Sequence, residues 1–346
     1  MINAALVSFG MSGKLFHAPF LNVNPNYNLE GCWERSTKNI QAAYPGTKSY
    51  NSYAELLSDP NVDLVIVNSP NDTHFEYAKQ ALLSGKHVVV EKAFTVSSSE
   101  AFELDIIASK VNKQLAVYHN RRFDADFLTI QKLIADGQIG ELLDVQISFE
   151  RYRTSLSPKV HKETPTPGAG LLMDLGPHLM DQALLLSGKP QAIFADIRTT
   201  RKEALVDDYF MMHLYYPTHR ITLTSGMLFM QQLPGYKIYG TKGCFIKNRS
   251  DIQEADLMAG KIPNTKDWGK EAPENFGTLT TDNNGAISTK IIPSLQGNYG
   301  LFYEQMADAI LNQAPVPVTA IEGAHIIQML EAARESSLTK KVIVLQ

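Results

Sequence analysis

Apolar residues gather in short runs along the first third of the chain, with amphipathic stretches between them. The runs are rich in Val, Ile and Leu, which favours β-strands. Strands are predicted at residues 4–9, 29–33, 62–68, 87–91 and 115–118. Because these strands alternate with helical patterns, they indicate parallel β-α-β units in a doubly wound sheet.

Two of the intervening stretches carry helix signals at their ends. In residues 73–84 apolar side chains recur at helical spacing, and Gly85 stands where a C-terminal cap belongs. Residues 97–111 begin with Ser97 and have Glu100 three positions later, a capping-box pattern. Both stretches are therefore predicted to be helices.

The pattern changes after about residue 122. Residues 123–135 are predicted to form a helix, and longer runs of alternating apolar and polar residues follow it. Strands of this kind are predicted at residues 143–149, 208–215, 220–225 and 236–246. They indicate a largely antiparallel sheet with one covered face. Residues 259–300 are interpreted as a long ordered loop, and residues 301–311 and 321–337 as two closing helices.

Composition and charge narrow the class of protein. The chain has 346 residues, enough for two domains, with 44% hydrophobic residues and a net charge of −4. A mildly acidic chain without a long basic run is a poor partner for nucleic acid or a membrane surface. Cys32 and Cys244 lie far apart and suggest no disulfide framework, and no signal peptide pattern opens the chain. A cytoplasmic protein is expected.

A dinucleotide-binding fingerprint follows the first predicted strand. Ser8 stands at its first glycine position, and Gly10, Ser12 and Gly13 follow. In such a turn one glycine lets the backbone approach the pyrophosphate and another lets helix and strand pack closely. Glu34 lies 21 residues past Gly13, where the fingerprint expects an acidic residue that binds the ribose hydroxyls.

The choice between NAD and NADP stays open at this point. A carboxylate at Glu34 would repel a 2′-phosphate and favours NAD, whereas the guanidinium of the next residue, Arg35, could hold that phosphate. Glu34 gives NAD the modest preference.

Three later segments complete a family pattern. They are Val90-Glu91-Lys92-Ala93, Tyr118-His119-Asn120-Arg121-Arg122, and the stretch 173–181 that contains Asp174-Leu175-Gly176-Pro177-His178. In this order, with the fingerprint before them, they resemble the Gfo/Idh/MocA family of oxidoreductases over nearly the whole chain. The subgroup that contains the NADP-dependent scyllo-inositol dehydrogenases is the most similar.

The resemblance implies a fold and an assembly. The fold class is α/β, with an N-terminal Rossmann domain over residues 1–122 and a C-terminal α/β domain with a large, mostly antiparallel open sheet over residues 123–346. Members of the family are commonly dimers or tetramers. A homodimer or homotetramer is expected, joined through the open face of the second sheet, because a large open sheet with apolar positions must be covered.

The resemblance also implies site residues. Lys92 corresponds to the family lysine near the nicotinamide, although the proline that usually follows it is Ala93 here. Asp174 and His178 correspond to the family's Asp-x-x-x-His pattern. The residues that correspond to the cofactor-lining segments are Ser69, Pro70, His74, Glu91, Lys92 and Asn120. The substrate implied is a sugar or cyclic polyol.

Elementary chemistry agrees with these assignments. Oxidation of a secondary alcohol needs a base for the hydroxyl proton while the hydride leaves for the nicotinamide, and histidine suits that role. A nearby lysine can stabilise the developing alkoxide. The same residues also have plainer interpretations: Lys92 could be a surface lysine, and Gly176-Pro177 could break the helix so that His178 merely starts another. No histidine has a partner at metal spacing, so no metal is expected.

Two other functions compete with a dehydrogenase. One is a sensor that binds NAD(P) without catalysis, which Ser8 and Ala93 favour weakly and which Lys92, Asp174 and His178 oppose. The other is a redox-assisted glycosidase, which would reduce and reoxidise bound NAD within one turnover and consume none.

Overall fold

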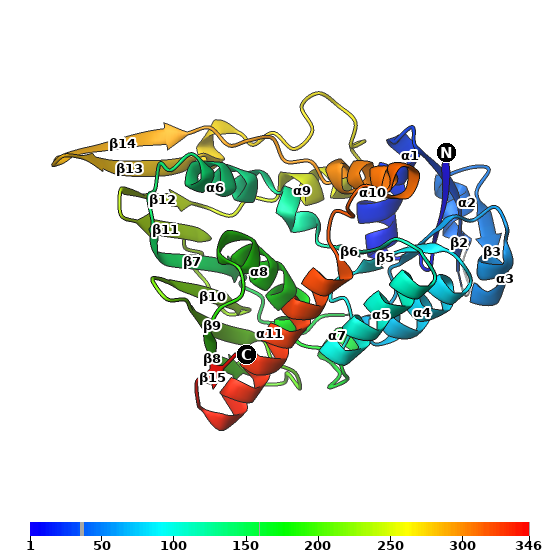
Figure 1. The fold of residues 1–346 in the computed structure, drawn as a ribbon, viewed down its shortest axis with the longest axis horizontal. Helices are drawn as coiled ribbons and strands as arrows, with labels where there is room; N and C mark the ends of the chain where they lie inside the picture. The colour runs from blue at the N-terminus through cyan, green and yellow to red at the C-terminus, as the bar shows by residue number, and fades with distance from the viewer. Residues whose placement is uncertain (35–37, 159, 346) are drawn as a thin grey trace. The chain divides into compact units, whose positions relative to one another are not determined.

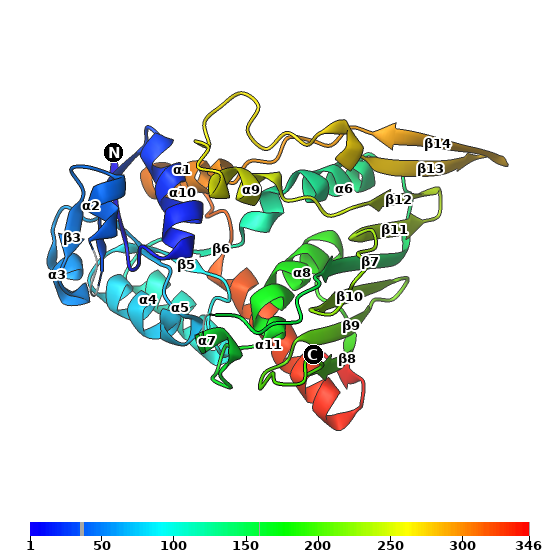
Figure 2. The ribbon, with the colours of Figure 1, turned by 180° about the vertical axis from the view of Figure 1, so that it is seen from behind.

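The computed structural model describes residues 1–34, 38–158 and 160–345 (Figures 1 and 2). The chain forms two compact units. The first contains residues 1–120, 253–268 and 298–327, and the second contains the remaining segments 121–252, 269–297 and 328–346. The first change of unit lies close to the expected boundary at residue 122. The return of residues 253–268 and 298–327 to the first unit was not expected, because a contiguous second domain was predicted.

The first unit contains the predicted parallel sheet. Its six strands have the order β3-β2-β1-β4-β5-β6, and every neighbouring pair is parallel. They are β1 Ile2–Leu6, β2 Tyr27–Trp33, β3 Lys48–Tyr50, β4 Leu64–Val67, β5 His87–Glu91 and β6 Leu115–Tyr118. The doubly wound prediction is confirmed. The sequence missed β3, which has only three residues and so shows no period.

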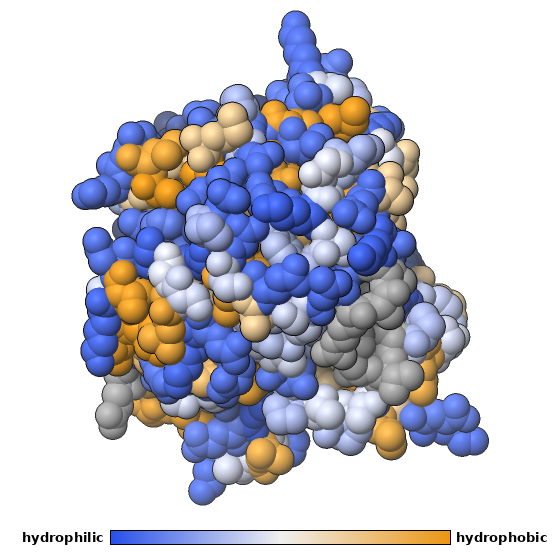
Figure 3. Space-filling view, turned by 90° about the vertical axis from the view of Figure 1, so that its right-hand side faces the viewer, coloured by the Kyte–Doolittle hydropathy of each residue, from blue (hydrophilic) through white to orange (hydrophobic). Residues whose placement is uncertain are grey.

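Helices cover both faces of this sheet (Figure 1). They are η1 Gly13–His17, α1 Ala18–Val23, α2 Asn39–Ala43, α3 Tyr53–Ser58, η2 Asn71–Thr73, α4 His74–Leu83, α5 Ser98–Lys110, α9 Ile252–Met258, α10 Gly300–Asn312 and the first part of α11 Ala320–Thr339. The helix start at Ser97 is confirmed, because the Ser97 side chain accepts a hydrogen bond from the Glu100 amide, and the Glu100 carboxylate accepts from the Val96 amide (3.2 Å). On the face in Figure 3 hydrophilic residues predominate, and the apolar ones form small separate patches.

The second unit is built on a nine-stranded sheet of order β14-β13-β12-β11-β7-β10-β9-β8-β15. The strands are β7 Leu142–Glu150, β8 Ala192–Arg198, β9 Tyr209–Tyr215, β10 Arg220–Gly226, β11 Tyr236–Gly240, β12 Gly243–Lys247, β13 Gly277–Asn283, β14 Ala286–Ile292 and β15 Ile343–Val344. All neighbours are antiparallel except β7 and β10. The prediction of a mostly antiparallel sheet is confirmed.

Two predictions for the second unit are wrong in detail. The single strand expected at residues 236–246 is a hairpin of β11 and β12, which turns at Thr241 and Lys242. The loop expected at residues 259–300 contains the β13–β14 hairpin. Its turn residues Asn284 and Gly285 both have positive φ, at 56° and 88°, which is the pattern that Asn-Gly favours in two-residue hairpins.

One face of the second sheet is covered by helices. The helices of this unit are most of η3 Asn120–Phe123, α6 Ala125–Ala135, α7 Val160–Glu163, α8 Leu171–Ser187, η4 Pro273–Asn275 and the last part of α11. Beneath α8, alternate residues of β9 and β10 such as Phe210, Met212 and Leu223 are fully buried. The residues between them, such as Met211 and Thr222, are half-buried on the other face, as the period of two requires.

Candidate active site

The fingerprint turn is held to β4 by Asn68. The Ser8 amide donates to Asn68 Oδ1 (2.9 Å), Asn68 Nδ2 donates to the Ser8 carbonyl (2.8 Å), and the Ser8 hydroxyl donates to the Asn68 carbonyl (3.0 Å). Ser8 is not among the described residues with positive φ. The turn therefore does not need glycine at this position. No sequence pattern marks Asn68, because a lone asparagine after a strand belongs to no motif.

The two glycines of the turn differ in their surroundings. A Cβ at Gly13 would lie 2.4 Å from the Ser8 carbonyl oxygen, so helix and strand can approach only with glycine there. A Cβ at Gly10 would meet only Ser8 Oγ, at 3.8 Å. The protein itself thus leaves the space beside Gly10 open, next to the start of a helix, as a bound pyrophosphate would require. These residues fit a dinucleotide.

The first helix begins with a π-helical turn. In η1 the Ala18 amide donates to the Gly13 carbonyl, five residues earlier, instead of four. The Phe16 carbonyl accepts a hydrogen bond from the hydroxyl of Tyr118 (2.8 Å), at the end of β6. The turn places His17 in the interior, where its side chain is fully buried.

Glu34, predicted to bind the ribose, has contacts of another kind. Its Oε1 accepts from the Asn39 amide (3.0 Å) and its Oε2 from the Ile40 amide (3.1 Å), so the carboxylate caps the start of α2. Contact of Glu34 with a ribose stays a prediction. Arg35, the alternative ligand for a 2′-phosphate, lies outside the described residues.

Lys92 follows β5 directly after a buried carboxylate. Glu91 Oε2 accepts from the Lys92 amide (3.1 Å), and Glu91 Oε1 lies 3.0 Å from His17 Nε2. Burial alone would raise the pKa of Glu91, but the hydrogen bond from His17 and the charge of Lys92 hold that pKa below its usual range. Glu91 is therefore an anion beside the lysine that the family pattern singles out.

His74 fixes the chain just beyond Lys92. Its Nδ1 lies 2.8 Å from the Ala93 carbonyl oxygen and its Nε2 lies 2.9 Å from the Ser69 carbonyl oxygen. Its side chain is fully buried, and burial lowers the pKa of His74. We expected this histidine to line the cofactor. That contact stays a prediction; in the structure the ring lies between the backbone carbonyls of Ala93 and Ser69. The peptide bond between Lys92 and Ala93 is cis.

The other predicted cofactor residues lie at the same edge of the sheet. Ser12 Oγ lies 3.4 Å from Asn68 Nδ2. Ser69 and Pro70 form the turn after β4, which the Thr73 hydroxyl holds through contacts of 2.7 Å to Ser69 Oγ and the Pro70 carbonyl. Asn120 follows β6 and is buried. Parallel sheets bind ligands at the carboxyl ends of their strands, and the predicted residues of the first unit gather there.

Asp174 and His178 lie one turn apart on α8 of the second unit. The helix runs through Gly176 and Pro177 without a break, so the interpretation of His178 as a helix start is wrong. A Cβ at Gly176 would lie 3.1 Å from Leu330 of α11, which shows that close packing outweighs the poor helix propensity of Gly-Pro. Asp174 Oδ1 forms an ion pair with Lys162 Nζ (3.0 Å), a residue that the sequence analysis did not select.

Arg122 and Asp181 anchor α8 rather than the site. Arg122 donates from Nε to Asp181 Oδ2 (2.9 Å) and from its terminal nitrogen to Oδ1 (2.6 Å), and Asp181 is buried. The paired, bidentate geometry fits a structural ion pair.

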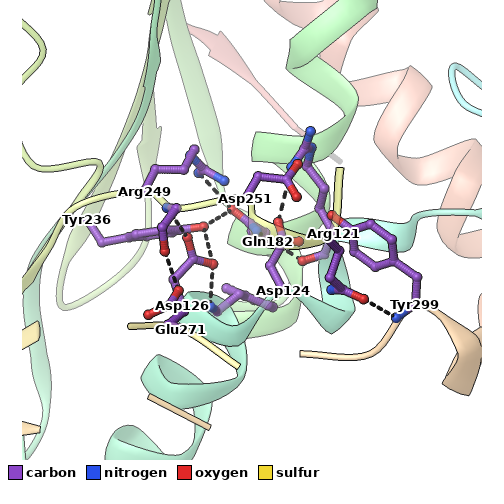
Figure 4. A network of polar contacts seen from close by, with 12 residues as sticks. Arg121, Asp124, Asp126, Gln182, Tyr236, Arg249, Asp251, Glu271 and Tyr299 are labelled. Atoms are coloured by element: carbon purple, nitrogen blue, oxygen red, sulfur yellow. Dashed lines mark hydrogen bonds and ion pairs between the residues drawn. The ribbon is translucent and has the colours of Figure 1, made fainter. Parts of the chain in front are cut away.

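A buried polar network lies between α6, α8 and the sheet of the second unit (Figure 4). The Tyr236 hydroxyl lies 3.3 Å from Asp126 Oδ1 and 3.2 Å from Gln182 Oε1, and Arg249 donates to the same Gln182 oxygen (3.3 Å). Burial raises the pKa of Asp126, although the charges of Arg249 and Lys247 oppose it. No sequence motif marks this network.

Neither a metal cluster nor a membrane-spanning helix is found among the described residues. No cluster of three or more His, Cys, Asp or Glu side chains there could hold a metal ion. No helix in the same part of the chain combines the length and the apolar character needed to cross a bilayer.

Comparison with known proteins places both units in one family. Residues 2–119 match the oxidoreductase family with an NAD-binding Rossmann fold, and residues 131–345 match its C-terminal alpha/beta domain. Over 345 residues the chain is 37% identical to a Bacillus subtilis protein named scyllo-inositol 2-dehydrogenase (NADP(+)) IolW, covering 100% of this chain and 96% of that one.

Solved structures agree with this placement. The oxidoreductase yvaA from Bacillus subtilis has a TM-score of 0.95 at 36% identity, with both chains fully covered. An oxidoreductase from Bacteroides fragilis has a TM-score of 0.91 at 39% identity, again with both chains fully covered.

Proposed function

Since the chain belongs to the Gfo/Idh/MocA family of oxidoreductases, we propose that it transfers a hydride between a secondary alcohol of a sugar or cyclic polyol and a nicotinamide cofactor. The observation that carries this proposal is the likeness, over all of the chain, to a relative named for scyllo-inositol. The residues around the fingerprint turn and Lys92 support it, because they fit a dinucleotide and a reacting alcohol beside it.

In the proposed mechanism each residue of the candidate site has one task. Gly10, Ser12 and Gly13 hold the pyrophosphate, and the nicotinamide, when bound, accepts the hydride. His178 takes the hydroxyl proton as general base. Lys92 stabilises the alkoxide that develops, and Asp174 orients the substrate or His178. Lys162 is a further candidate for substrate contact, because it is the ion-pair partner of Asp174.

A screen tests this function. Inositols, aldoses and sugar acids are offered with NAD and with NADP, and the reduced nicotinamide is followed by its absorbance. Turnover of at least one polyol or sugar with net cofactor reduction is expected. Hydrolysis of a glycoside without net consumption of cofactor would replace the proposal with the glycosidase, and cofactor binding without any turnover would favour the sensor.

We further propose NADP as the preferred cofactor. Both carboxylate oxygens of Glu34 accept amides of α2, so the carboxylate that favoured NAD has another task. The relative at 37% identity is named for NADP. Fluorescence titration with NADH and NADPH checks the preference. A lower dissociation constant for NADH would return the assignment to NAD through Glu34.

The assembly proposed is a homodimer or homotetramer. The face of the nine-stranded sheet opposite α8 carries half-buried side chains that include Tyr209, Met211 and Tyr215. Such a face gains stability when a second copy covers it. Light scattering at micromolar concentration is expected to give at least twice 38.4 kDa, and the monomer mass would contradict the proposal.

A further inference from the structure

The interior of the first unit contains a chain of polar contacts that ends at Lys92. Tyr303 Oη on α10 lies 2.6 Å from His17 Nδ1, His17 Nε2 lies 3.0 Å from Glu91 Oε1, and Glu91 Oε2 accepts the Lys92 amide. Neither the fingerprint nor the family pattern quoted above includes His17 or Tyr303. The proposed mechanism has no use for either residue.

The direction of these hydrogen bonds follows from the acceptor at one end. A carboxylate only accepts, so His17 Nε2 must carry the proton that is donated to Glu91. Its Nδ1 can then accept the hydroxyl proton of Tyr303. Tyr303 is itself fixed, because the Tyr27 hydroxyl donates to its carbonyl (2.8 Å) and the Tyr118 and Tyr27 rings lie 5.8 Å from its own. Each member therefore has one orientation.

Resting on the function proposed above, we infer that His17 is a positioning residue for Lys92, acting through Glu91. His17 holds the buried carboxylate in place and anionic, and the carboxylate fixes the backbone at the point where the chain leaves β5. On the other side of Lys92, His74 contacts the Ala93 carbonyl. The lysine is thus held on both sides by buried histidines, at a place where the family's usual proline is absent.

The inference predicts a specific failure when His17 loses its donor. In a His17→Leu variant, Glu91 stays buried beside the same groups but lacks its strongest partner, so burial governs its protonation. The titratable groups that face Glu91 are His17, Lys92, His74, Tyr118 and Tyr303. With His17 gone, burial raises the pKa of Glu91, and once the carboxylate is protonated the Lys92 amide loses a charged acceptor.

The experiment compares five variants of the full chain with the substrate and cofactor found in the screen. His17→Leu is expected to lower kcat about tenfold to a hundredfold, since a displaced catalytic group costs about that much. KM and the dissociation constant of reduced cofactor should stay within about twofold, because ground-state binding is untouched. The kcat of His17→Leu should rise with pH between 6 and 9 more steeply than that of the wild type. His17→Gln, which keeps an N–H donor, should recover much of the loss.

The matched control is His87→Leu. His87 lies at the opposite end of the same strand, where its Nδ1 accepts the Gln114 amide (3.0 Å). Its variant should retain the wild-type kcat and pH profile. If His17→Leu does not fold, Glu91→Gln carries the test, because it keeps the shape and removes the charge. A wild-type kcat and pH profile in that variant would overturn the inference.

A readout independent of turnover is the position of the imidazole proton. Long-range ¹H–¹⁵N spectra should show His17 protonated at Nε2 from pH 6 to 9, and a proton at Nδ1 alone would overturn the inference. Lys92→Ala separates the two proposals. If Lys92→Ala is impaired but His17→Leu is not, only the positioning role fails; if Lys92→Ala keeps the wild-type kcat, the role of Lys92 and its positioning fail together.

Discussion

Glu91 in the first unit and Glu271 in the second are both buried carboxylates with a basic partner, but the partners differ in kind. Glu271 Oε2 lies 2.6 Å from Lys247 Nζ, both side chains are fully buried, and the hydroxyls of Ser250 and Ser294 also donate to the carboxylate. Glu91 has an imidazole and a backbone amide instead. Glu271 therefore takes its side-chain contact from the end of a lysine, whereas Glu91 takes its from an imidazole N–H.

The Lys247–Glu271 pair stabilises the fold of the second unit, whereas we assign Glu91 to the positioning of a reacting group. The Lys247 ammonium also donates to the Asn275 carbonyl (2.6 Å), so the pair ties β12 to the segment around η4 and carries no exposed atom toward a ligand. Glu91 lies one residue from a lysine assigned to the reaction. We expect disruption of the first pair to appear in unfolding measurements and disruption of the second to appear in kcat.

The largest effect is expected at the proposed general base, His178, which belongs to neither of these buried pairs. His178→Ala should lower kcat by about 10²–10⁴, the usual loss when a general base is removed, and leave cofactor affinity and stability nearly unchanged. Steady-state kinetics and fluorescence titration measure the two quantities. A wild-type kcat across pH 6 to 9 would show that His178 is not the base, and Lys92 would become the candidate, because the buried Tyr118 hydroxyl donates to the Phe16 carbonyl.

The second largest effect is expected at the ion pair of Lys247 and Glu271. Lys247→Met leaves Glu271 buried without its ammonium and should cost about 3–5 kcal/mol in the free energy of unfolding. Urea denaturation measures this loss. The double variant Lys247→Met with Glu271→Gln should recover part of it, because no uncompensated charge remains. A loss below about 1 kcal/mol in the single variant would place Glu271 in the class of weakly coupled ions.

A third prediction concerns the fingerprint turn of the first unit, where Asn68 holds the Ser8 backbone against Gly13. Gly13→Ala places a methyl group 2.4 Å from the Ser8 oxygen, which Asn68 holds in place, so the variant should lose about 1–3 kcal/mol of stability and bind cofactor weakly. Gly10→Ala is the matched control. It should weaken cofactor binding without loss of stability, since its methyl group meets open space. Equal melting temperatures for the two variants would contradict this.

The smallest effect is a difference in pH dependence. The pKa of Glu91 is lowered on folding, so its contribution is present above the unfolded value of about 4.3 and is lost as pH falls through the folded value. The pKa of Asp126 is raised, so its contribution is lost as pH rises through the folded value. Glu91→Gln should therefore become more destabilising, relative to wild type, as pH rises from 3.5 to 7, and Asp126→Asn less so. Denaturation series at several pH values check the signs, and slopes of equal sign would contradict them.

The sequence predicted five of the six strands of the first unit and the sheet type of the second, because these strands are long enough to show apolar runs or an alternating pattern. It failed where tertiary packing overrides local preference, as at Gly176 and Pro177 against Leu330. The β13–β14 hairpin could have been found, since Asn284-Gly285 is a strong turn signal between two runs of alternating residues.

Some residues of the candidate site could be predicted from the sequence and others could not. Lys92, Asp174 and His178 could be selected because they stand in motifs with fixed spacing. His17 and Asn68 could not, because their partners Glu91 and Ser8 lie 74 and 60 residues away and only the fold brings them together. Glu34 was selected by its distance from the fingerprint, and sequence distance cannot show that its oxygens accept the amides of α2.

The π-helical turn in η1 has a consequence for how relatives of this chain are aligned. A π-turn contains one more residue than the α-turn it replaces, so an ungapped alignment pairs every later residue of the helix with a neighbour that points about 100° away. A relative with a regular helix here would need a one-residue gap between the positions of Gly13 and Ala18. Without the gap, an alignment would pair His17 with a residue that points away from β5, and its presence or absence among relatives would be misjudged.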